Sequence, residues 1–278
     1  MSEPHAPRRR ARRAVLGSLA VAAVGTPLLL SRGPAGAATK AAPITPLAPR
    51  LMWSPNPASD GLRAFEGIED DRSNSHMIGR VHVKHIYVQN GVYRVDMHRI
   101  DRDGSDRQRS EVKGMQAAGR NLEMDLGQTW RITYDLFLPE SLKGCDHFCH
   151  IFQLKRPGPG SSPLVTMSLR RRSGREELAL RSFASGGDIG STALAPLRNK
   201  WINVDMTFRI GDAGKGMGRL VITDGARTVV NSTRDRIDIW LGDRIRPKWG
   251  IYRSVRSSPS QILDTFLLMR NMRAFLGS

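Results

Sequence analysis

Three short segments, far apart in the chain, carry polar residues at even spacing. These are Arg107, Arg109, Glu111 and Lys113 in the first segment, Gln153 and Lys155 in the second, and Lys248 and Tyr252 in the third. On a β-strand, even spacing directs side chains to one face. Such side chains are costly to bury without partners, so we expect them on an open, concave sheet that lines a groove. Their excess of positive charge suits an extended anionic ligand.

Each segment suggests chemistry and also allows a simpler interpretation. In the first, Glu111 can orient Arg109 through a bidentate ion pair and leave the rest of the guanidinium for a ligand carboxylate. A solvated edge strand with alternating charges is the alternative. In the second, Gln153 can donate to a carboxylate, while Lys155 supplies charge or, with a lowered pKa, accepts a proton. The alternative there is an exposed polar face.

The third segment combines a tyrosine with cations. Lys248, Gly250 and Tyr252 share a face, and the missing side chain at Gly250 makes room for a ligand. Lys248 and Arg253 would stabilise a phenolate, which a tyrosine needs to accept or donate a proton. A tyrosine at a sheet edge with its hydroxyl in water is the alternative.

The order of these motifs resembles the signature strands of jelly-roll polysaccharide lyases, the group that includes alginate, glucuronan and heparin-I-type lyases. The motifs are Arg109-Ser-Glu-Val112, Gln153-Leu-Lys155 and Lys248-Trp-Gly-Ile-Tyr-Arg253. Trp130–Pro139 and Leu197–Trp201 resemble framework strands of that group, and the resemblance spans most of residues 80–275. It implies β-elimination on a uronic-acid polymer, in which the proton beside the carboxylate is removed and the glycosidic oxygen leaves.

The resemblance also implies roles for individual residues. Arg109 and Gln153 match the positions that neutralise the carboxylate and so stabilise the charge that develops as the proton departs. Tyr252 matches the tyrosine that protonates the leaving oxygen and in some members removes the proton. Lys248 matches a lysine of heparin-I-type members. Arg107, Glu111 and Lys113 are expected to bind substrate.

The identity of the base is left open by the motifs. Alginate-type members carry a histidine two residues after the Gln, where this chain has Lys155. The candidates are Lys155, His150, His98, or Tyr252 acting alone. His150 lies on the opposite face from Gln153 in a regular strand, so its use requires a bend near Cys149.

Two acidic motifs are interpreted as turns, and not as a glycosidase site or a calcium site. Glu123–Gln128 resembles the signature of sandwich-fold glycosidases, but Gln128 replaces the second carboxylate that hydrolysis requires. Asp101–Asp106 could bind a structural calcium ion, yet it lacks the later bidentate glutamate of a calcium loop, and an Asp-rich turn is expected. We therefore expect no metal and no cofactor.

Cys145 and Cys149 are the two cysteines of the chain. A disulfide between them requires a turn at residues 146–148, because four strand residues would separate their Cα atoms too far. An oxidising compartment favours the disulfide, with free thiols as the alternative. A zinc site would need a second ligand pair at suitable spacing.

The remaining pattern is that of an all-β protein. Asn90-Gly91 joins two alternating runs in Ile86–Val95 and predicts a hairpin. Many short strands separated by turn residues indicate a β-sandwich or jelly roll of the concanavalin A-like type with a concave groove. Short helices are expected at most at Ser141–Lys143 or Asp235–Leu241. Further strands are expected at Arg107–Val112, Trp130–Leu138, Cys149–Lys155, Leu164–Arg170, Glu177–Ser182, Trp201–Ile210, Gly218–Thr223, Thr228–Asn231, Lys248–Arg253 and Ile262–Met272.

The N-terminus predicts export. Arg12-Arg13, an apolar run and a small-residue site make residues 1–37 similar to a twin-arginine signal, with a membrane anchor as the alternative. Residues 38–55, rich in Pro and Ala, are expected to be a linker, and residues 56–278 the domain. The signal holds six arginines and one glutamate, so the mature chain keeps +12 of the total +17.

The charge and the motifs together favour a secreted lyase. A basic exported protein suits acidic polysaccharide better than nucleic acid, although an inert basic surface is the alternative. We expect a monomer, no nucleic-acid partner, and no membrane association once the signal is removed. The competing functions are a non-catalytic carbohydrate-binding module and a sandwich-fold glycoside hydrolase.

Overall fold

The computed structural model describes residues 48–158 and 160–277. The predicted export signal, residues 1–37, and most of the predicted linker lie outside these residues. No helix in the described part of the chain is long and apolar enough to cross a membrane.

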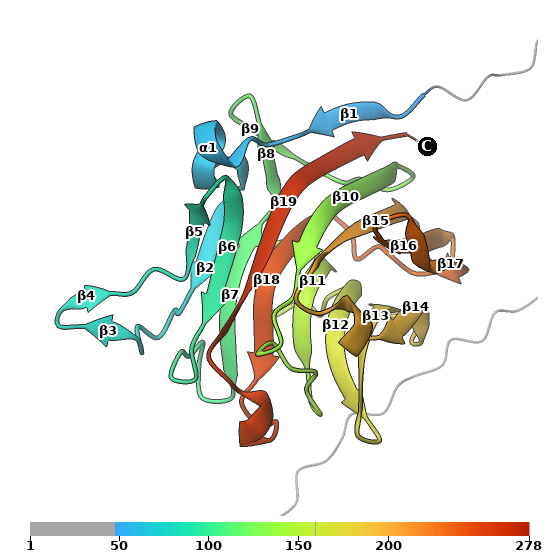
Figure 1. The fold of residues 1–278 in the computed structure, drawn as a ribbon. Helices are drawn as coiled ribbons and strands as arrows, with labels where there is room; N and C mark the ends of the chain where they lie inside the picture. The colour runs from blue at the N-terminus through green and yellow to red at the C-terminus, as the bar shows by residue number, and fades with distance from the viewer. Residues whose placement is uncertain (1–47, 159, 278) are drawn as a thin grey trace, which may run out of the picture. The chain divides into compact units, whose positions relative to one another are not determined.

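One of the two large antiparallel sheets, here called the groove sheet, holds all three signature segments (Figure 1). Its strand order is β14-β13-β12-β11-β18-β7-β2. The strands are β2 (Gly67–Asp70), β7 (Arg107–Lys113), β11 (Cys149–Lys155), β12 (Val165–Arg172), β13 (Arg175–Ser182), β14 (Asp188–Ala193) and β18 (Arg246–Ser254).

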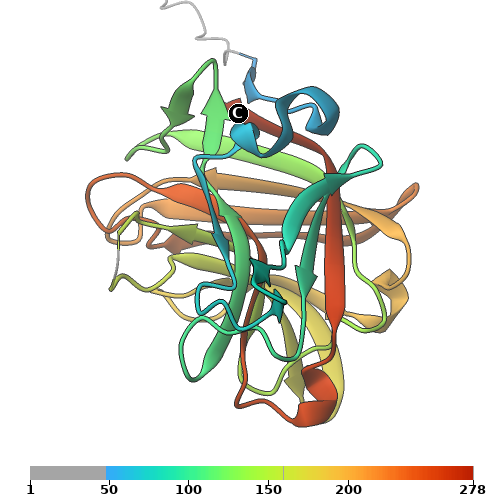
Figure 2. The ribbon, with the colours of Figure 1, turned by 90° about the vertical axis from the view of Figure 1, so that its left-hand side faces the viewer.

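The other large sheet, here called the back sheet, has the order β17-β16-β15-β10-β19-β6-β5, with β1 paired to β19. Figure 2 turns the edge formed by β2, β5 and β6 toward the viewer. The strands are β1 (Arg50–Trp53), β5 (Ile86–Gln89), β6 (Val92–Met97), β10 (Thr129–Phe137), β15 (Trp201–Arg209), β16 (Gly216–Asp224), β17 (Arg227–Ile237) and β19 (Thr265–Leu276).

The core lies between the two sheets. In β10 every second residue, from Trp130 to Leu136, is buried, which is the period of a strand with one face on a core. Phe152 of the groove sheet stacks at 6.2 Å from Phe208 of the back sheet. Trp249 of the groove sheet stacks at 5.6 Å from Trp53 of β1. The expected all-β jelly-roll sandwich is confirmed.

Short elements connect the sheets. Two small ribbons are formed by β3 (Met77–Ile78) with β4 (Val81–His82), and by β8 (Met115–Ala117) with β9 (Arg120–Leu122). The helical turns are α1 (Pro57–Asp60), η1 (Gly61–Ala64), η2 (Ala195–Leu197) and η3 (Pro259–Gln261).

The hairpin is confirmed, and three local expectations are corrected. Asn90 and Gly91 both have positive φ, as the two-residue turn between β5 and β6 requires. Ser141–Lys143 is a turn and not a helix. Asp235–Leu241 is not helical, because β17 extends through Ile237. Residues 50–53 belong to the domain and not to the linker, because β1 pairs with β19 and buries Trp53.

The cysteines do not form the expected disulfide. A bend at Asp146 and His147 brings them together, but both are buried free thiols. Cys145 is held by a backbone bridge to Arg170, and Cys149 by pairing with Arg253 of β18. A hydrogen bond from Cys149 lowers the pKa of the Cys145 thiol, whereas the same contact and burial raise that of Cys149.

Candidate active site

Strand pairing brings the three predicted segments together. β18 lies between β11 and β7, and its register sets Tyr252 opposite Arg109 on one side and His150 on the other. Lys248 lies opposite Gln153 and Lys113 in the same way. Neighbouring strands are separated by about 4.8 Å, so residues in register meet directly. The expectation that these segments share one polar face is therefore confirmed.

A β-bulge adds His150 to that face. The register of β11 shifts between His150 and Phe152 against both of its neighbours, β12 and β18. Against β12, β11 has one extra residue at Ile151, and one extra residue reverses the side on which the preceding side chains project. His150 thus lies beside Tyr252, with ring centroids 5.8 Å apart, and the bend that the sequence required near Cys149 is present.

Two cavities meet at Tyr252 and Pro163 and together form what we call the groove. The first, of about 550 Å³, is lined in the described structure by eight cationic side chains and one carboxylate, that of Glu69. The second, of about 380 Å³, contains aromatic rings and three arginines. The cations of the first cavity are Arg72, Arg107, Arg109, Lys113, Lys155, Arg156, Arg246 and Lys248.

Cations surround the Tyr252 side chain. The guanidinium of Arg109 lies 4.0 Å from the centre of the Tyr252 ring, a cation–π contact that contributes about 0.5–2 kcal/mol. Nη1 of Arg107 donates to the Tyr252 hydroxyl at 3.3 Å. Negative charge developing on this oxygen would therefore be stabilised.

His150 is neutral and hydrogen-bonds to Ser168 of the neighbouring strand. Burial, followed by the charge of Arg109, lowers the pKa of His150 to about 4. Its Nδ1 lies 2.8 Å from Oγ of Ser168, and the Ser168 hydroxyl donates to Oγ1 of Thr166 at 3.3 Å. In the tautomer with the proton on Nδ1, the Ser168 oxygen accepts this hydrogen bond. Nε2 of His150 is left without a proton and can act as a base.

Glu111 has a different role from the one expected. It is completely buried and accepts hydrogen bonds from Nε2 of Gln153 at 2.5 Å and Nζ of Lys248 at 2.6 Å. Its distance to Nε of Arg109 is 3.8 Å, so it makes no bidentate pair with that residue. Glu111 therefore does not line the groove as a substrate ligand. It neutralises Lys248 and orients the amide of Gln153 from below.

Arg109 is instead held by two carboxylates that the motifs did not indicate. Nη1 donates to Glu69 at 3.0 Å, and Nε lies 2.9 Å from Asp103. Burial opposes ionisation of Glu69, but Lys248 and Arg109 outweigh it and hold the pKa of Glu69 below its usual range. Glu69 could be found only through the pairing of β2 with β7, which sets Glu69 opposite Glu111.

The two lysines differ in environment. Lys248 is 2% exposed and donates to Glu69 at 2.7 Å as well as to Glu111. Lys155 is partly exposed and donates to Oγ of Ser161 at 2.6 Å. Burial, and then the charges of Lys248 and Arg109, lower the pKa of Lys155.

Gly250 does not make room for a ligand. Its φ is +143°, and a Cβ there would lie 2.1 Å from the carbonyl oxygen of Ser110. The missing side chain allows β18 to approach β7 closely, which corrects the sequence-based interpretation.

The remaining candidates lie outside the groove. Glu123 pairs with Arg244 at 2.9 Å, and Gln128 closes a turn by bonding Asp125, as expected for a non-catalytic motif. His98 lines a separate cavity with His76 and Asp264, so it does not face Tyr252 as a base. Asp101, the first residue of the expected Asp-rich turn, is fully buried against histidines.

The fold and site together define an all-β sandwich with a cationic groove centred on a tyrosine. No protein-family model and no curated protein matches the sequence. Similar solved structures include alginate lyase AlgAT5 of polysaccharide lyase family 7, at 13% identity over 75% of this chain and 93% of that chain, with a TM-score of 0.49. Endo-β-1,4-glucuronan lyase from the fungus Trichoderma reesei is 10% identical over 83% and 95%, with a TM-score of 0.49. Alginate lyase A1-II′ is 12% identical over 71% and 86%, also with a TM-score of 0.49.

Proposed function

We propose that this protein is a polysaccharide lyase that cleaves a uronic-acid-containing polymer by β-elimination. The observation that carries the proposal is the position of Tyr252. Its hydroxyl lies where the two cavities of the groove meet, with neutral His150 on one neighbouring strand and Arg109 on the other. A polymer bound along both cavities would present a glycosidic bond to this tyrosine.

The chemistry follows from the charges of the groove. The proton beside a uronate carboxylate is barely acidic, and its removal leaves negative charge that spreads onto the carboxylate oxygens. Arg109 and the Gln153 amide, together with the cations of the first cavity, would stabilise that charge. The electron pair then forms the new double bond, and the glycosidic oxygen departs with a proton. The products are an unsaturated sugar and a new chain end.

The groove offers one residue suited to act as base and one suited to act as acid. His150 is neutral, and in the tautomer with its proton on Nδ1 the free Nε2 is suited to remove a proton from the sugar. The Tyr252 hydroxyl is surrounded by two arginines that would stabilise its phenolate, so it is suited to donate a proton to the leaving oxygen. Lys155 donates to Ser161, and Lys248 is paired with two carboxylates. Neither lysine offers a comparable lone pair.

The proposed setting is extracellular. A twin-arginine-type signal and a mature charge of +12 support export and an acidic polysaccharide substrate. We propose that the exported chain acts as a monomer on polyuronates such as alginate, glucuronan or glycosaminoglycans.

Tyr252→Phe tests the mechanism because it removes only the hydroxyl. We expect cleavage of a susceptible polyuronate to fall by at least about 10²-fold, with polymer binding largely retained. Cleavage is followed by the ultraviolet absorbance of the unsaturated product, and binding by affinity electrophoresis. Tyr87→Phe, in the back sheet, is the matched control and should keep full activity.

Three other outcomes would contradict the proposal. Full activity of Tyr252→Phe would eliminate Tyr252 as the acid. Binding without cleavage by the wild type across a panel of polyuronates would indicate a binding module. New reducing ends without the ultraviolet absorbance would indicate a hydrolase.

A further inference from the structure

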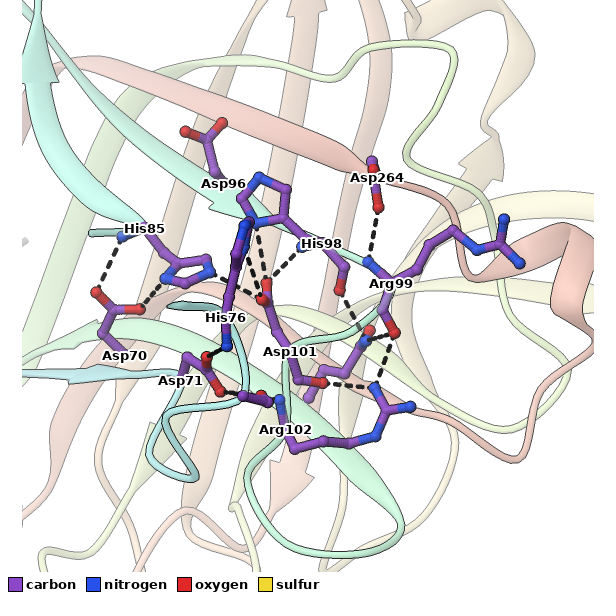
Figure 3. A network of polar contacts seen from close by, with 12 residues as sticks. Asp70, Asp71, His76, His85, Asp96, His98, Arg99, Asp101, Arg102 and Asp264 are labelled. Atoms are coloured by element: carbon purple, nitrogen blue, oxygen red, sulfur yellow. Dashed lines mark hydrogen bonds and ion pairs between the residues drawn. The ribbon is translucent and has the colours of Figure 1, made fainter. Parts of the chain in front are cut away.

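Four side chains outside the groove converge on one point. Figure 3 shows His76, His85, His98 and Asp101 with their rings and carboxylate turned toward one another. Each offers one ligand atom, and these four atoms all lie within 4.8 Å of one another. His76 precedes β3, His85 precedes β5, and His98 and Asp101 follow β6, so three connections contribute to this histidine cluster.

The distances to Asp101 resemble those of a metal site. Oδ1 of Asp101 lies 2.9 Å from Nε2 of His85 and 3.5 Å from Nδ1 of His76. Oδ2 of Asp101 lies 3.2 Å from Nδ1 of His98. In a tetrahedral zinc site with bonds of 2.0–2.1 Å, neighbouring ligand atoms are about 3.3–3.4 Å apart. A small inward movement of the rings would complete such a site.

Three of these atoms are buried, and in the described structure they contact one another and make no hydrogen bond to a residue outside the cluster. They are Nδ1 of His76, Nε2 of His85 and Oδ1 of Asp101. Both nitrogens face the single oxygen Oδ1 of Asp101, at 3.5 Å and 2.9 Å, so a cation between them would give all three buried atoms a partner. Asp101 and His85 are fully buried, which makes the deficit costly.

A proton alone does not resolve this arrangement. Nε2 of His85 and Oδ1 of Asp101 lie 2.9 Å apart, so a proton between them would pair these two atoms. A proton on His85 would give that ring its hydrogen bond but would leave Nδ1 of His76 without a partner. All four ligand atoms could coordinate a cation at the centre.

The surrounding residues orient the candidate ligands. Oδ1 of Asp70 lies 2.6 Å from Nδ1 of His85, which directs Nε2 toward the centre. Metal-binding histidines commonly contact a carboxylate in this way. Asp71 accepts from the backbone N–H of His76 at 2.7 Å, and Gln108 donates to the carbonyl of His98 at 2.8 Å. The connections that carry the ligands are therefore anchored.

We propose that His76, His85, His98 and Asp101 bind a structural zinc ion. Three imidazole nitrogens and one carboxylate suit a borderline transition-metal ion, whereas calcium requires oxygen ligands. His76 and His98 line a cavity of about 470 Å³, which provides an entry path. This site departs from the expectation of no metal, which rested on Asp101–Asp106 alone and did not include the histidines.

The proposed zinc would also support the groove. Asp70 follows Glu69, and Asp101 precedes Asp103 by two residues. Glu69 and Asp103 are the two carboxylates that hold Arg109. A zinc ion that ties these connections together would thus stabilise the position of Arg109 without contacting substrate.

The test measures zinc on the purified full chain and needs no polysaccharide, so its outcome is separate from that of the lyase proposal. The protein is loaded with zinc, dialysed and analysed by elemental mass spectrometry, and one zinc ion per chain is expected. Removal by a chelator should lower Tm, and zinc should restore it. The Co²⁺ form should show the intense visible bands of tetrahedral coordination.

His76→Ala and His98→Ala are the test variants, because both side chains are partly exposed and their loss leaves the core intact. Each should lose more than about 90% of the bound zinc while its near-ultraviolet circular dichroism stays native. His147→Ala, an exposed histidine outside the cluster, is the control and should keep its zinc. Absence of zinc from the loaded wild type, or equal zinc in wild type and natively folded His76→Ala, would overturn the proposal.

Discussion

The groove and the histidine cluster both gather charged side chains that are partly or fully buried, but they are assembled differently. In the groove, Arg109, Tyr252 and His150 meet because three paired strands bring them into register. In the cluster, His76, His85 and Asp101 come from three connections between strands. Strand pairing repeats at a fixed spacing, whereas a connection has no such repeat. The groove is therefore held by the sheet itself, and the cluster needs a central ion.

The largest expected effect is on kcat/KM, and it distinguishes His150 from Lys155 as the base in the groove. His150→Ala should lower kcat/KM for polyuronate cleavage by about 10²–10⁴-fold, because it removes the neutral imidazole beside Tyr252. Lys155→Ala should change kcat/KM by less than about tenfold, because its ammonium already donates to Ser161. Initial rates of absorbance increase give both values.

A larger loss of kcat/KM in Lys155→Ala than in His150→Ala would identify Lys155 as the base. It would also show that the β-bulge at Ile151, which turns His150 into the groove, is a feature of packing alone. Thermal unfolding of both variants serves as the control for folding.

Lys248→Met tests how much the buried contact between Lys248 and Glu111 contributes to the free energy of unfolding. Among the described residues, the change leaves the fully buried Glu111 with the Gln153 amide as its remaining hydrogen-bond donor, and removing one partner of a buried pair costs about 3–5 kcal/mol. Urea denaturation should show this loss. Lys200→Met removes a half-exposed partner of Asp224 in the back sheet and should cost at most about 1 kcal/mol. Equal losses in the two variants would show that the groove network is as weak as a surface pair.

Asp70→Asn tests the carboxylate that orients His85 in the histidine cluster, and it has the smallest expected effect of these variants. The substitution keeps the size of the side chain but weakens the contact that orients His85, so zinc affinity should fall by about 10–100-fold. Competition with a chromophoric chelator measures this change. Asp96→Asn, which alters a carboxylate paired with Arg94 and Tyr87, should bind zinc as the wild type does. An unchanged affinity in Asp70→Asn would mean that the cluster is organised without its outer carboxylate.

The sequence predicted the residues that line the groove better than the residues that hold them in place. Even spacing in three segments was enough to identify the polar face of β7, β11 and β18, since side chains alternate along any strand. Glu69 and Asp103 were missed because their contacts with Arg109 depend on the pairing of β2 and on the path of the connection after β6. Glu111 was assigned to the substrate because spacing shows which face a residue occupies but not how deeply it is buried.

By itself, the sequence determined the all-β class, the Asn90-Gly91 hairpin and the shared face of Arg109, Gln153 and Tyr252. All of these depend on local periodicity and turn chemistry, which act between residues close in the chain. Only the tertiary structure decided that a bulge brings His150 beside Tyr252, that Gly250 serves strand packing, and that His76 and His85 meet Asp101. These features arise where segments distant in sequence come into contact, and no repeating spacing along the chain records such contacts.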